Sequence, residues 1–188
     1  RWECLSTKYA LPSIDIMTMF SDVAVSEPTF TEKICLPPYE GEKEFCDYPA
    51  LMTIIKNLNP EYVLELGTAH GNTVANICSE CNAKVFTVNA LPEQIEGNVI
   101  TYTLSKDEIG YVYKKNGFGN RVTQVYENTK NLNVLEFLAP NSIDLSIIDA
   151  CHDSDFVVND FLKIIPSLSE NAIVLLHDTH PSLKNLYI

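Results

Sequence analysis

The fold is decided by the stretch EYVLELGTAHGNT at residues 61–73 and by KVFTVN at residues 84–89. Together they predict a short buried strand over 62–66, a glycine turn, a helix over 71–80 and a second strand over 85–89. A strand, a glycine turn and a helix in this order form the opening unit of a nucleotide-binding α/β fold. The glycines are spaced G-x-x-x-G instead of G-x-G-x-x-G, which argues against a dinucleotide site.

The bulk properties favour one globular domain that acts on small molecules. The chain has 188 residues, 46% of them apolar and 20% charged, which is enough for a sizeable core. Its net charge of −12 repels nucleic acid phosphates, and Lys114-Lys115 is the only adjacent basic pair. We therefore expect no nucleic acid partner.

A membrane partner is not expected either, because no segment approaches the ~20 consecutive apolar residues that cross a bilayer. The N-terminus lacks the pattern of a signal peptide. Six cysteines occur in a chain too large to need a disulfide scaffold, and a lone Cys78-x-x-Cys81 is a weak zinc signal. We interpret the cysteines as thiols of a reducing compartment, which predicts a cytoplasmic location.

Beyond residue 90, strands and helices continue to alternate. We expect strands over 122–126, 143–149 and 172–177, and helices that begin at Ser105 and cover 132–138 and 155–167. Such alternation predicts a mostly parallel sheet with helices on both faces. A further helix is expected over 47–57, whereas 14–20 fits a short helix or a strand. We divide the chain into an N-terminal cap or lid, 1–58, and a core, 59–188.

Polar residues follow each expected strand. They are Glu65 and Gly67 after the first strand, Asn89 after the second, Glu127 to Thr129 after the third, Asp149 to Asp153 after the fourth, and His177 to His180 after the fifth. The carboxyl ends of parallel strands meet at one edge of a sheet, where ligands bind. Each polar residue alone could simply end its strand by bonding to turn amides. Their convergence favours a functional site.

A resemblance to a known family rests on three of these stretches. Glu65, Gly67 and Gly71 form E-x-G-x-x-x-G, Ile148-Asp149-Ala150-Cys151-His152 forms I-D-x-x-H, and Leu176-His177-Asp178-Thr179 contains an H-D pair. In this order they resemble class I S-adenosylmethionine-dependent methyltransferases, and within them the metal-dependent sugar O-methyltransferases of the macrocin and mycinamicin type. The resemblance covers about residues 45–180 and implies the Rossmann-like fold of that family.

The resemblance also implies a cofactor site. S-adenosylmethionine is expected over the turn formed by Gly67, Thr68, Ala69 and Gly71, with Glu65 near its methionine end. Asn89 is expected near the ribose and Asn128 near the adenine, and Asp149 is also expected to contact the cofactor.

The family's reaction implies a second set of residues. Asp149, His177 and Asp178 are expected to hold a divalent cation, with Mg²⁺ favoured by the carboxylates, and His152 is expected to be the general base. The acceptor would be a hydroxyl of a small molecule such as a natural-product sugar. The alternative for Asp178 is to cap a turn, and the alternative for His152 is a contact at the start of a helix.

Two departures from the family pattern support a second hypothesis. Asn89 stands where the family usually has an acidic residue for the ribose hydroxyls. The sequence also ends at Ile188, just after the fifth strand, whereas the family's sheet continues with two more strands. Strand five would be an open edge unless a later segment, the 14–20 segment or a second copy of the chain covers it. The alternative function is therefore a degenerate methyltransferase fold that binds or assembles without catalysis.

Overall fold

The computed structural model describes residues 15–30, 48–95 and 103–177. The elements follow in the order η1 (Ile16–Thr18), α2 (Tyr48–Leu58), β1 (Tyr62–Leu66), α3 (Asn72–Glu80), β2 (Lys84–Val88), η3 (Pro92–Gln94), α4 (Tyr111–Lys115), β3 (Val122–Val125), η4 (Val134–Glu136), β4 (Ile143–Ile148), α5 (Ser154–Ile164), η5 (Ile165–Ser167) and β5 (Leu168–Leu176). Here η marks a short 3₁₀ helix.

The five strands form one sheet with the order β3-β2-β1-β4-β5, and every neighbouring pair is parallel. The predicted parallel α/β fold is therefore confirmed. The chain moves outward from β1 to β3 on one side and then returns to place β4 on the other side of β1. In parallel sheets a crevice opens at such a reversal, beyond the carboxyl ends of the strands.

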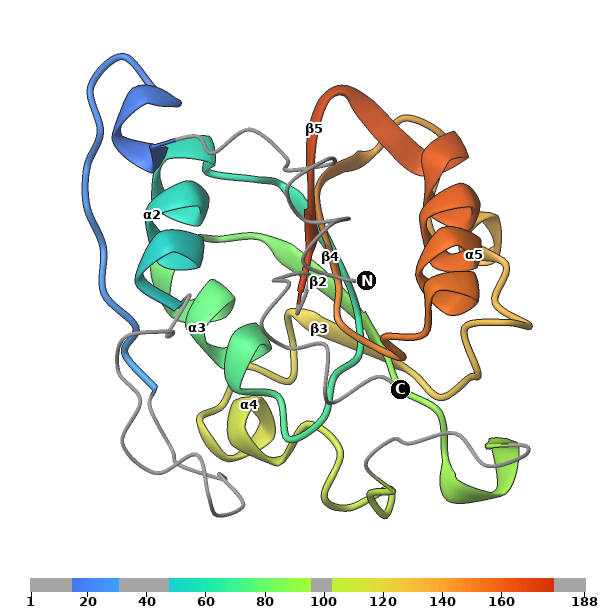
Figure 1. Ribbon diagram of the computed structural model, residues 1–188. Coiled ribbons are helices and arrows are strands. Elements are labelled where there is room, and N and C mark those ends of the chain that lie inside the picture. Colours follow the sequence, from blue (N-terminus) through green and yellow to red (C-terminus); the bar gives the residue numbers. More distant parts are fainter. Residues whose placement is uncertain (1–14, 31–47, 96–102, 178–188) are drawn as a thin grey trace, which may run out of the picture.

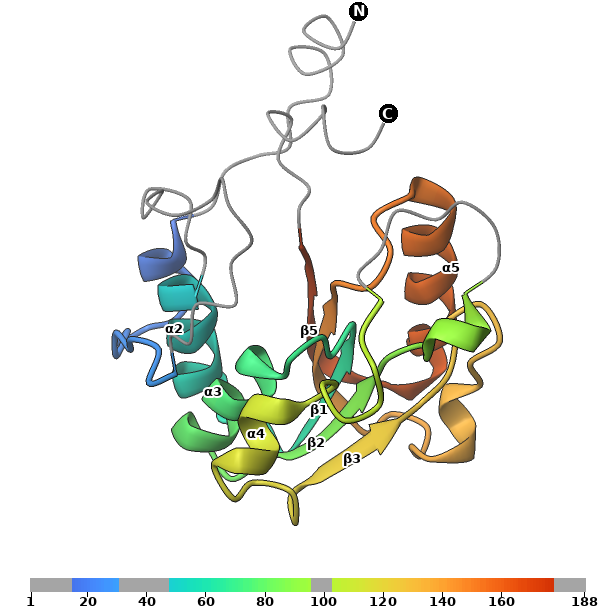
Figure 2. The ribbon, with the colours of Figure 1, turned by 90° about the horizontal axis from the view of Figure 1, so that it is seen from below.

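Helices cover the sheet on both faces (Figures 1 and 2). α2, α3 and α4 lie on one face and α5 lies on the other. The helices of the first face contribute Met52, Ile77 and Val112 to a core cluster with Val63 and Val85 of the sheet. A second cluster, on the side of α5, contains Leu64, Leu66, Val88 and Ile148 with Ile164. Alternate residues of β1 thus enter opposite cores, which explains why this strand is apolar on both faces.

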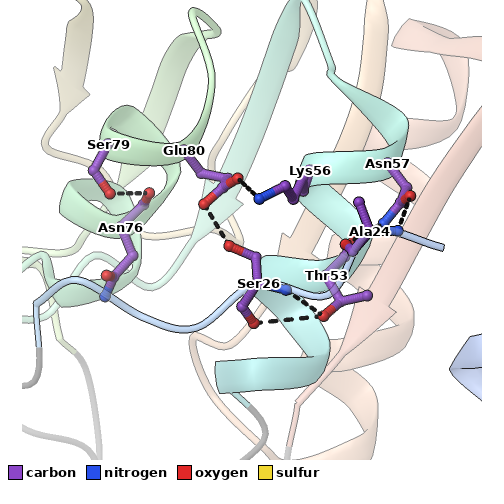
Figure 3. Close-up of polar contacts among 8 residues, drawn as sticks. All are labelled: Ala24, Ser26, Thr53, Lys56, Asn57, Asn76, Ser79 and Glu80. Atoms are coloured by element: carbon purple, nitrogen blue, oxygen red, sulfur yellow. Dashed lines mark hydrogen bonds and ion pairs between the residues drawn. The ribbon is translucent and has the colours of Figure 1, made fainter.

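Residues 21–30, here called the strap, run across α2 and α3 (Figures 1 and 3). The backbone of Ala24 exchanges two hydrogen bonds of 2.9 Å with the Asn57 carboxamide. The Ser26 backbone N–H donates to Thr53 Oγ1 at 3.2 Å, and its hydroxyl donates to Glu80 Oε2 at 2.6 Å. This part of the predicted cap is fixed to the helical layer, while the division at residue 58 stays a prediction.

Three expected helices differ from the observed ones. Residues 106–110 form turns and α4 begins only at Tyr111, because Gly110 has a φ of +72°, a left-handed conformation that a right-handed helix cannot contain. The helix expected over 132–138 is only the 3₁₀ turn η4. The helix expected over 155–167 changes from α5 to η5 at Ile165, next to Pro166.

β5 lies at the edge of the sheet that the structure describes. It is longer than expected, since it begins at Leu168. Residues 15–20 contain the 3₁₀ helix η1, which contacts α2 and contributes no strand, so they do not cover β5. In the described ranges no helix has both the length and the apolar character that crossing a bilayer requires.

The described cysteines Cys78, Cys81 and Cys151 are buried free thiols. Burial raises the pKa of Cys78 to about 11 and also raises that of Cys81, so neither forms a reactive thiolate near neutral pH. Arg121 donates hydrogen bonds to the backbone carbonyls of both residues, which ties β3 to the end of α3. The Cys78-x-x-Cys81 pair therefore has a packing role here.

Candidate functional site

A pocket of about 330 Å³ opens beyond the carboxyl ends of the strands. Residues that follow all five strands line it, together with residues of the loop before α4 and of α5. They are Gly67, Ala69, Val88, Asn89, Ala90, Ile95, Leu104, Glu127, Asn128, Thr129, Asp149, Ala150, Cys151, His152, Phe156 and His177. The convergence predicted from the strand ends is therefore observed, at the topological switch point of the sheet.

The glycine turn after β1 has no room for a side chain at its first glycine. Gly67 has a φ of +108°, and a Cβ atom built there would lie 2.1 Å from the backbone oxygen of Asp149. The backbone N–H groups of Gly67 and Thr68 both donate to Val88 O, at 2.9 and 3.2 Å. The turn is thus pressed between the ends of β2 and β4, and only glycine permits this approach.

Asn89 holds the same turn from the end of β2. Its Oδ1 accepts a hydrogen bond of 2.9 Å from the Ala69 backbone N–H, and its Nδ2 donates to Ala90 O at 2.8 Å. Ala69 has a φ of +44°, a left-handed conformation that a non-glycine residue adopts only when its surroundings hold it. The Asn89 carboxamide is therefore a structural clamp and also part of the pocket wall.

The adjoining wall is built by a second set of carboxamides. Asn128 donates from Nδ2 to Gln94 O at 3.0 Å, and its Oδ1 accepts from the Lys130 N–H at 3.0 Å. Gln94 in turn accepts from the Leu91 N–H and donates to Tyr126 O. These contacts join the loop after β2 to the loop after β3, so the side of the pocket beside Asn128 is fixed before any ligand enters.

Glu65 of β1 is paired with Thr87 of β2 and does not line the pocket. Its side chain is only 1% exposed, and its Oε2 accepts a hydrogen bond of 2.6 Å from Thr87 Oγ1. The Thr87 hydroxyl also lies 2.7 Å from that of Thr68, which accepts from Gln124 Nε2 at 2.9 Å. Burial raises the pKa of Glu65 to about 8, and the hydrogen bond from Thr87 offsets only part of this shift. This raised pKa favours the protonated, neutral form of Glu65.

At the other side of the pocket, Asp149 lies between two histidines. Its Oδ1 is 3.0 Å from His152 Nε2 and 2.9 Å from His177 Nδ1. The Asp149 N–H donates to Leu66 O and the His177 N–H donates to Ile148 O, so sheet-like bonds fix both backbones. Burial would raise the pKa of Asp149, but the hydrogen bonds from His152 and His177 outweigh it and hold that pKa below its ordinary value. Asp149 is an anion that both imidazoles face.

Most of the predicted site residues line this pocket. They are Gly67, Ala69, Asn89, Asn128, Asp149, His152 and His177. Glu65, Thr68 and Gly71 were predicted to contact the cofactor but do not line it. Thr68 is engaged with Thr87 and Gln124, and Gly71 is packed against Tyr113, whose ring would lie 2.7 Å from a Cβ atom there. Asp178 lies outside the described residues.

The expected set of metal ligands is described only in part, because Asp178 lies outside the described residues. We expected Asp149, His177 and Asp178, with His152 as a separate base. In the described chain the group that could bind a metal ion is Asp149, His152 and His177, whose ligand atoms all lie within 4.8 Å of one another. Sequence reasoning also missed the apolar lining by Ile95, Leu104 and Phe156, because these residues have no polar signal at a strand end.

Comparison with solved structures supports the fold. A candidate caffeoyl-CoA O-methyltransferase from Staphylococcus aureus is 20% identical, with a TM-score of 0.51, over 68% of this chain and 55% of that one. The SAH-bound Podospora anserina methyltransferase PaMTH1 is 21% identical, with a TM-score of 0.51, over 69% and 50%. Cofactor-bound Rv0187 from MTB is 21% identical, with a TM-score of 0.53, over 77% and 57%.

The chain thus spans about half the length of these structures, and identities this low show a shared fold alone. No curated protein matches the chain. A family model described as a methyltransferase domain matches residues 64–179, which is more than half of the sequence. The match begins in β1 and includes the glycine turn. It also includes Asp149, His152 and His177. With a five-stranded parallel sheet of class I methyltransferase type, the chain belongs to this methyltransferase domain family.

Proposed function

We propose that this chain binds S-adenosylmethionine in the pocket at the strand ends and transfers its methyl group to a hydroxyl of a small molecule. One observation carries the proposal. A single pocket joins the glycine turn and the Asn89 and Asn128 carboxamides on one side to the Asp149, His152 and His177 group on the other. A cofactor and an acceptor can therefore meet within one cavity.

The walls of the pocket suit the nucleoside part of that cofactor. Apolar side chains of Val88, Ile95, Leu104 and Phe156 offer surfaces for a flat base, and the volume of about 330 Å³ falls in the range of small-molecule sites. Asn89 and Asn128 each keep hydrogen-bonding capacity beyond the bonds already described, because an amide has two donors and two acceptor sites. Gly67 and Ala69 of the glycine turn also line the pocket, so a ligand there lies beside the backbone of the turn.

The acceptor chemistry follows from what methyl transfer requires. The bond between sulfur and the methyl carbon breaks while an oxygen–carbon bond forms, and the hydroxyl proton must leave. A hydroxyl is a poor nucleophile at neutral pH, so a group at the site must take the proton or lower the hydroxyl pKa. The histidines beside Asp149 supply nitrogen atoms for either task. This favours an oxygen acceptor, and a natural-product sugar is one example.

Magnesium assistance, which the sequence predicted, stays a prediction, because the expected ligand Asp178 lies outside the described residues. Mg²⁺ prefers oxygen ligands in a strict octahedron, and the group beside the pocket has one carboxylate and two imidazoles. The proposal therefore assigns no step to Mg²⁺.

A second candidate is a methyltransferase fold that binds the cofactor without catalysis. The observation that favours it is the Asn89 carboxamide, which is already bonded to Ala69 and Ala90 and carries no charge for the ribose hydroxyls. Loss of a charge-assisted hydrogen bond weakens such binding by about 1 kcal/mol or more.

An assay of methyl transfer separates these candidates. The chain is incubated with S-adenosylmethionine and a panel of hydroxylated acceptors, including a catechol and several glycosides, and release of S-adenosylhomocysteine is measured. The proposal predicts acceptor-dependent release that Asp149→Asn lowers by at least 100-fold. Cofactor binding without release for any acceptor would favour the second candidate, and the absence of both binding and release would remove both candidates.

A further inference from the structure

β5 presents an open edge at one end of the sheet. It spans Leu168–Leu176 and pairs with β4 on one side, whereas no strand of the described chain pairs with its other side. Proteins usually protect such an edge with lysine, proline or a short strand. β5 has none of these, and its one charged residue, Glu170, precedes the apolar run 172–176. The outer backbone groups of β5 are therefore suited to pairing with another strand.

α5 carries an apolar stripe on its solvent side. The stripe consists of Val158, Phe161, Leu162 and Ile165, which are 57%, 40%, 60% and 45% exposed. Their spacing of i, i+3, i+4 and i+7 places them on one side of a helix. A helix of a soluble protein normally turns this pattern toward the core, but the buried residues of α5 are Asp160 and Ile164. The apolar stripe therefore faces outward.

The stripe lies toward the open edge of the sheet. On the other side of α5, Lys163 Nζ donates to Thr129 O at 2.9 Å, which fixes that side to the loop after β3. Phe161 and Ile165 are each two positions from Lys163, which is nearly opposite around a helix of 3.6 residues per turn. They thus point away from β3, and in the strand order this is the side of β5. Figure 2 shows α5 at the same end of the sheet as β5.

We propose that β5 and the α5 stripe, together called the edge face, bind a second copy of the chain. A two-fold axis perpendicular to the sheet would pair the two β5 strands antiparallel and keep both α5 helices on one face of the joined sheet. The two stripes would then face each other across the axis. A partner for this surface needs an open strand edge with an apolar helix beside it, and the chain itself supplies both.

The size of the edge face agrees with a dimer that uses both elements. A large apolar side chain has about 150–200 Å² of surface, so four that are half exposed offer roughly 350 Å². A standard interface buries about 800 Å² on each partner. The stripe alone is too small, and the edge of β5, about 30 Å long, adds the further contact area. The inference does not depend on the proposed function.

Sedimentation velocity of the full chain over a range of concentrations tests the inference. The mass should rise with concentration from that of one chain, 21.1 kDa, to that of two. The contacts are apolar and two copies with a net charge of −12 repel each other, so added salt should strengthen the dimer. We expect the dissociation constant to fall at least threefold between about 0.05 and 0.5 M NaCl. The mass of one chain at every concentration, or a dimer that salt weakens, would overturn the inference.

Two matched variants locate the interface. Val158→Glu places a charge in the stripe and should weaken the dimer at least tenfold. Val25→Glu changes an equally exposed valine, in the strap on the opposite face of the sheet, and should leave the dimer unaltered. Equal dissociation constants for these two variants would overturn the inference.

Hydrogen exchange tests the part of β5 and needs no variant. Backbone amides of Leu168–Leu176 that point away from β4 should exchange at least tenfold more slowly at concentrations where the dimer dominates than where single chains dominate. Exchange of β5 that does not depend on concentration would show that its edge is not paired in the dimer, and would also overturn the inference.

Discussion

Glu65 and Thr87 face each other in the parallel register of β1 and β2, and the Thr87 hydroxyl donates to the Glu65 carboxyl at 2.6 Å. Glu65 is the acidic residue of the glycine-turn motif, yet it is buried and does not line the pocket. Through Thr87 it is connected to a hydrogen-bond network that includes Thr68 of the turn and Gln124 of β3. Glu65 is therefore linked to the glycine turn by hydrogen bonds through Thr87.

Replacing Glu65 with Gln should change how stability depends on pH. The folded pKa of about 8 exceeds the ordinary value of 4.5, so this carboxyl favours the folded state fully below pH 4.5. Its contribution falls by about 1.4 kcal/mol per pH unit as pH rises from 4.5 to 8. Glu65→Gln keeps the side-chain volume but has no carboxyl to ionise. The free energy of unfolding in urea should therefore fall less steeply with pH in this variant than in the parent chain.

The control for this experiment is Glu61→Gln, a change at an exposed residue that precedes β1. The free energy of unfolding of this variant should depend on pH in the same way as that of the parent chain. Parallel profiles for Glu65→Gln and the parent chain would show that Glu65 is not a buried neutral carboxyl.

Gly67→Ala should strongly destabilise the fold. The new Cβ would lie 2.1 Å from the Asp149 backbone oxygen, and the φ of +108° is one that alanine rarely adopts. Backbone on both sides of the contact must move, which should cost about 3 kcal/mol or more. Gly119→Ala is the matched control, since a Cβ there meets nothing within 4 Å. The free energy of unfolding in urea is measured for both variants. Similar losses of stability in Gly67→Ala and Gly119→Ala would contradict the close packing of the turn at Gly67.

Asn76→Ala tests the anchoring of the strap to α3. The Asn76 side chain is fully buried, accepts from the N–H groups of Thr29 and Phe30 at 2.8 and 2.9 Å, and donates to Phe30 O at 2.9 Å. Its removal leaves backbone groups without partners and should cost about 2–4 kcal/mol. Asn57→Ala, at the more exposed anchor, should cost about 1 kcal/mol. Equal losses in chemical unfolding would mean that burial does not distinguish the two anchors.

Asn89→Asp should strengthen binding of S-adenosylmethionine. An aspartate can still accept from the Ala69 N–H, and its charge adds a stronger acceptor for the ribose hydroxyls. We expect about tenfold tighter binding by calorimetry, equivalent to about 1.4 kcal/mol. Asn131→Asp adds the same charge at an exposed position outside the pocket and should have no effect. Unchanged or weaker binding by Asn89→Asp would place the ribose elsewhere.

The sheet was predictable from sequence because its strands carry a plain local signal. Each is a short apolar run followed by a polar residue or glycine, as in 62–67 and 143–149, and the parallel topology then brings the strand ends together. The start of α4 was not predictable in the same way. Ser105 has the character of a helix cap, but its N–H and hydroxyl both bond to Glu108, within a turn that ends at the left-handed Gly110.

The site was predictable at the level of residue types and less so at the level of contacts. The sequence indicated Asp149, His152 and His177 separately, but their common meeting point depends on the side-chain directions at two strand ends. The partners of Glu65 and Thr68 come from β2 and β3, and no local pattern reveals such cross-strand bonds. Pocket residues such as Leu104 and Phe156 look like ordinary core residues in the sequence.

The most direct test of the account is calorimetric titration of the chain with S-adenosylhomocysteine, beside two variants that each add a tryptophan. Ala90 lines the pocket just after β2, so Ala90→Trp should fill part of the pocket with its large side chain. Ala139→Trp adds the same side chain at an exposed position outside the pocket. We predict one molecule bound per chain, no detectable binding by Ala90→Trp and unchanged binding by Ala139→Trp. Absence of binding by the parent chain, or equal binding by Ala90→Trp, would contradict a cofactor site at these strand ends.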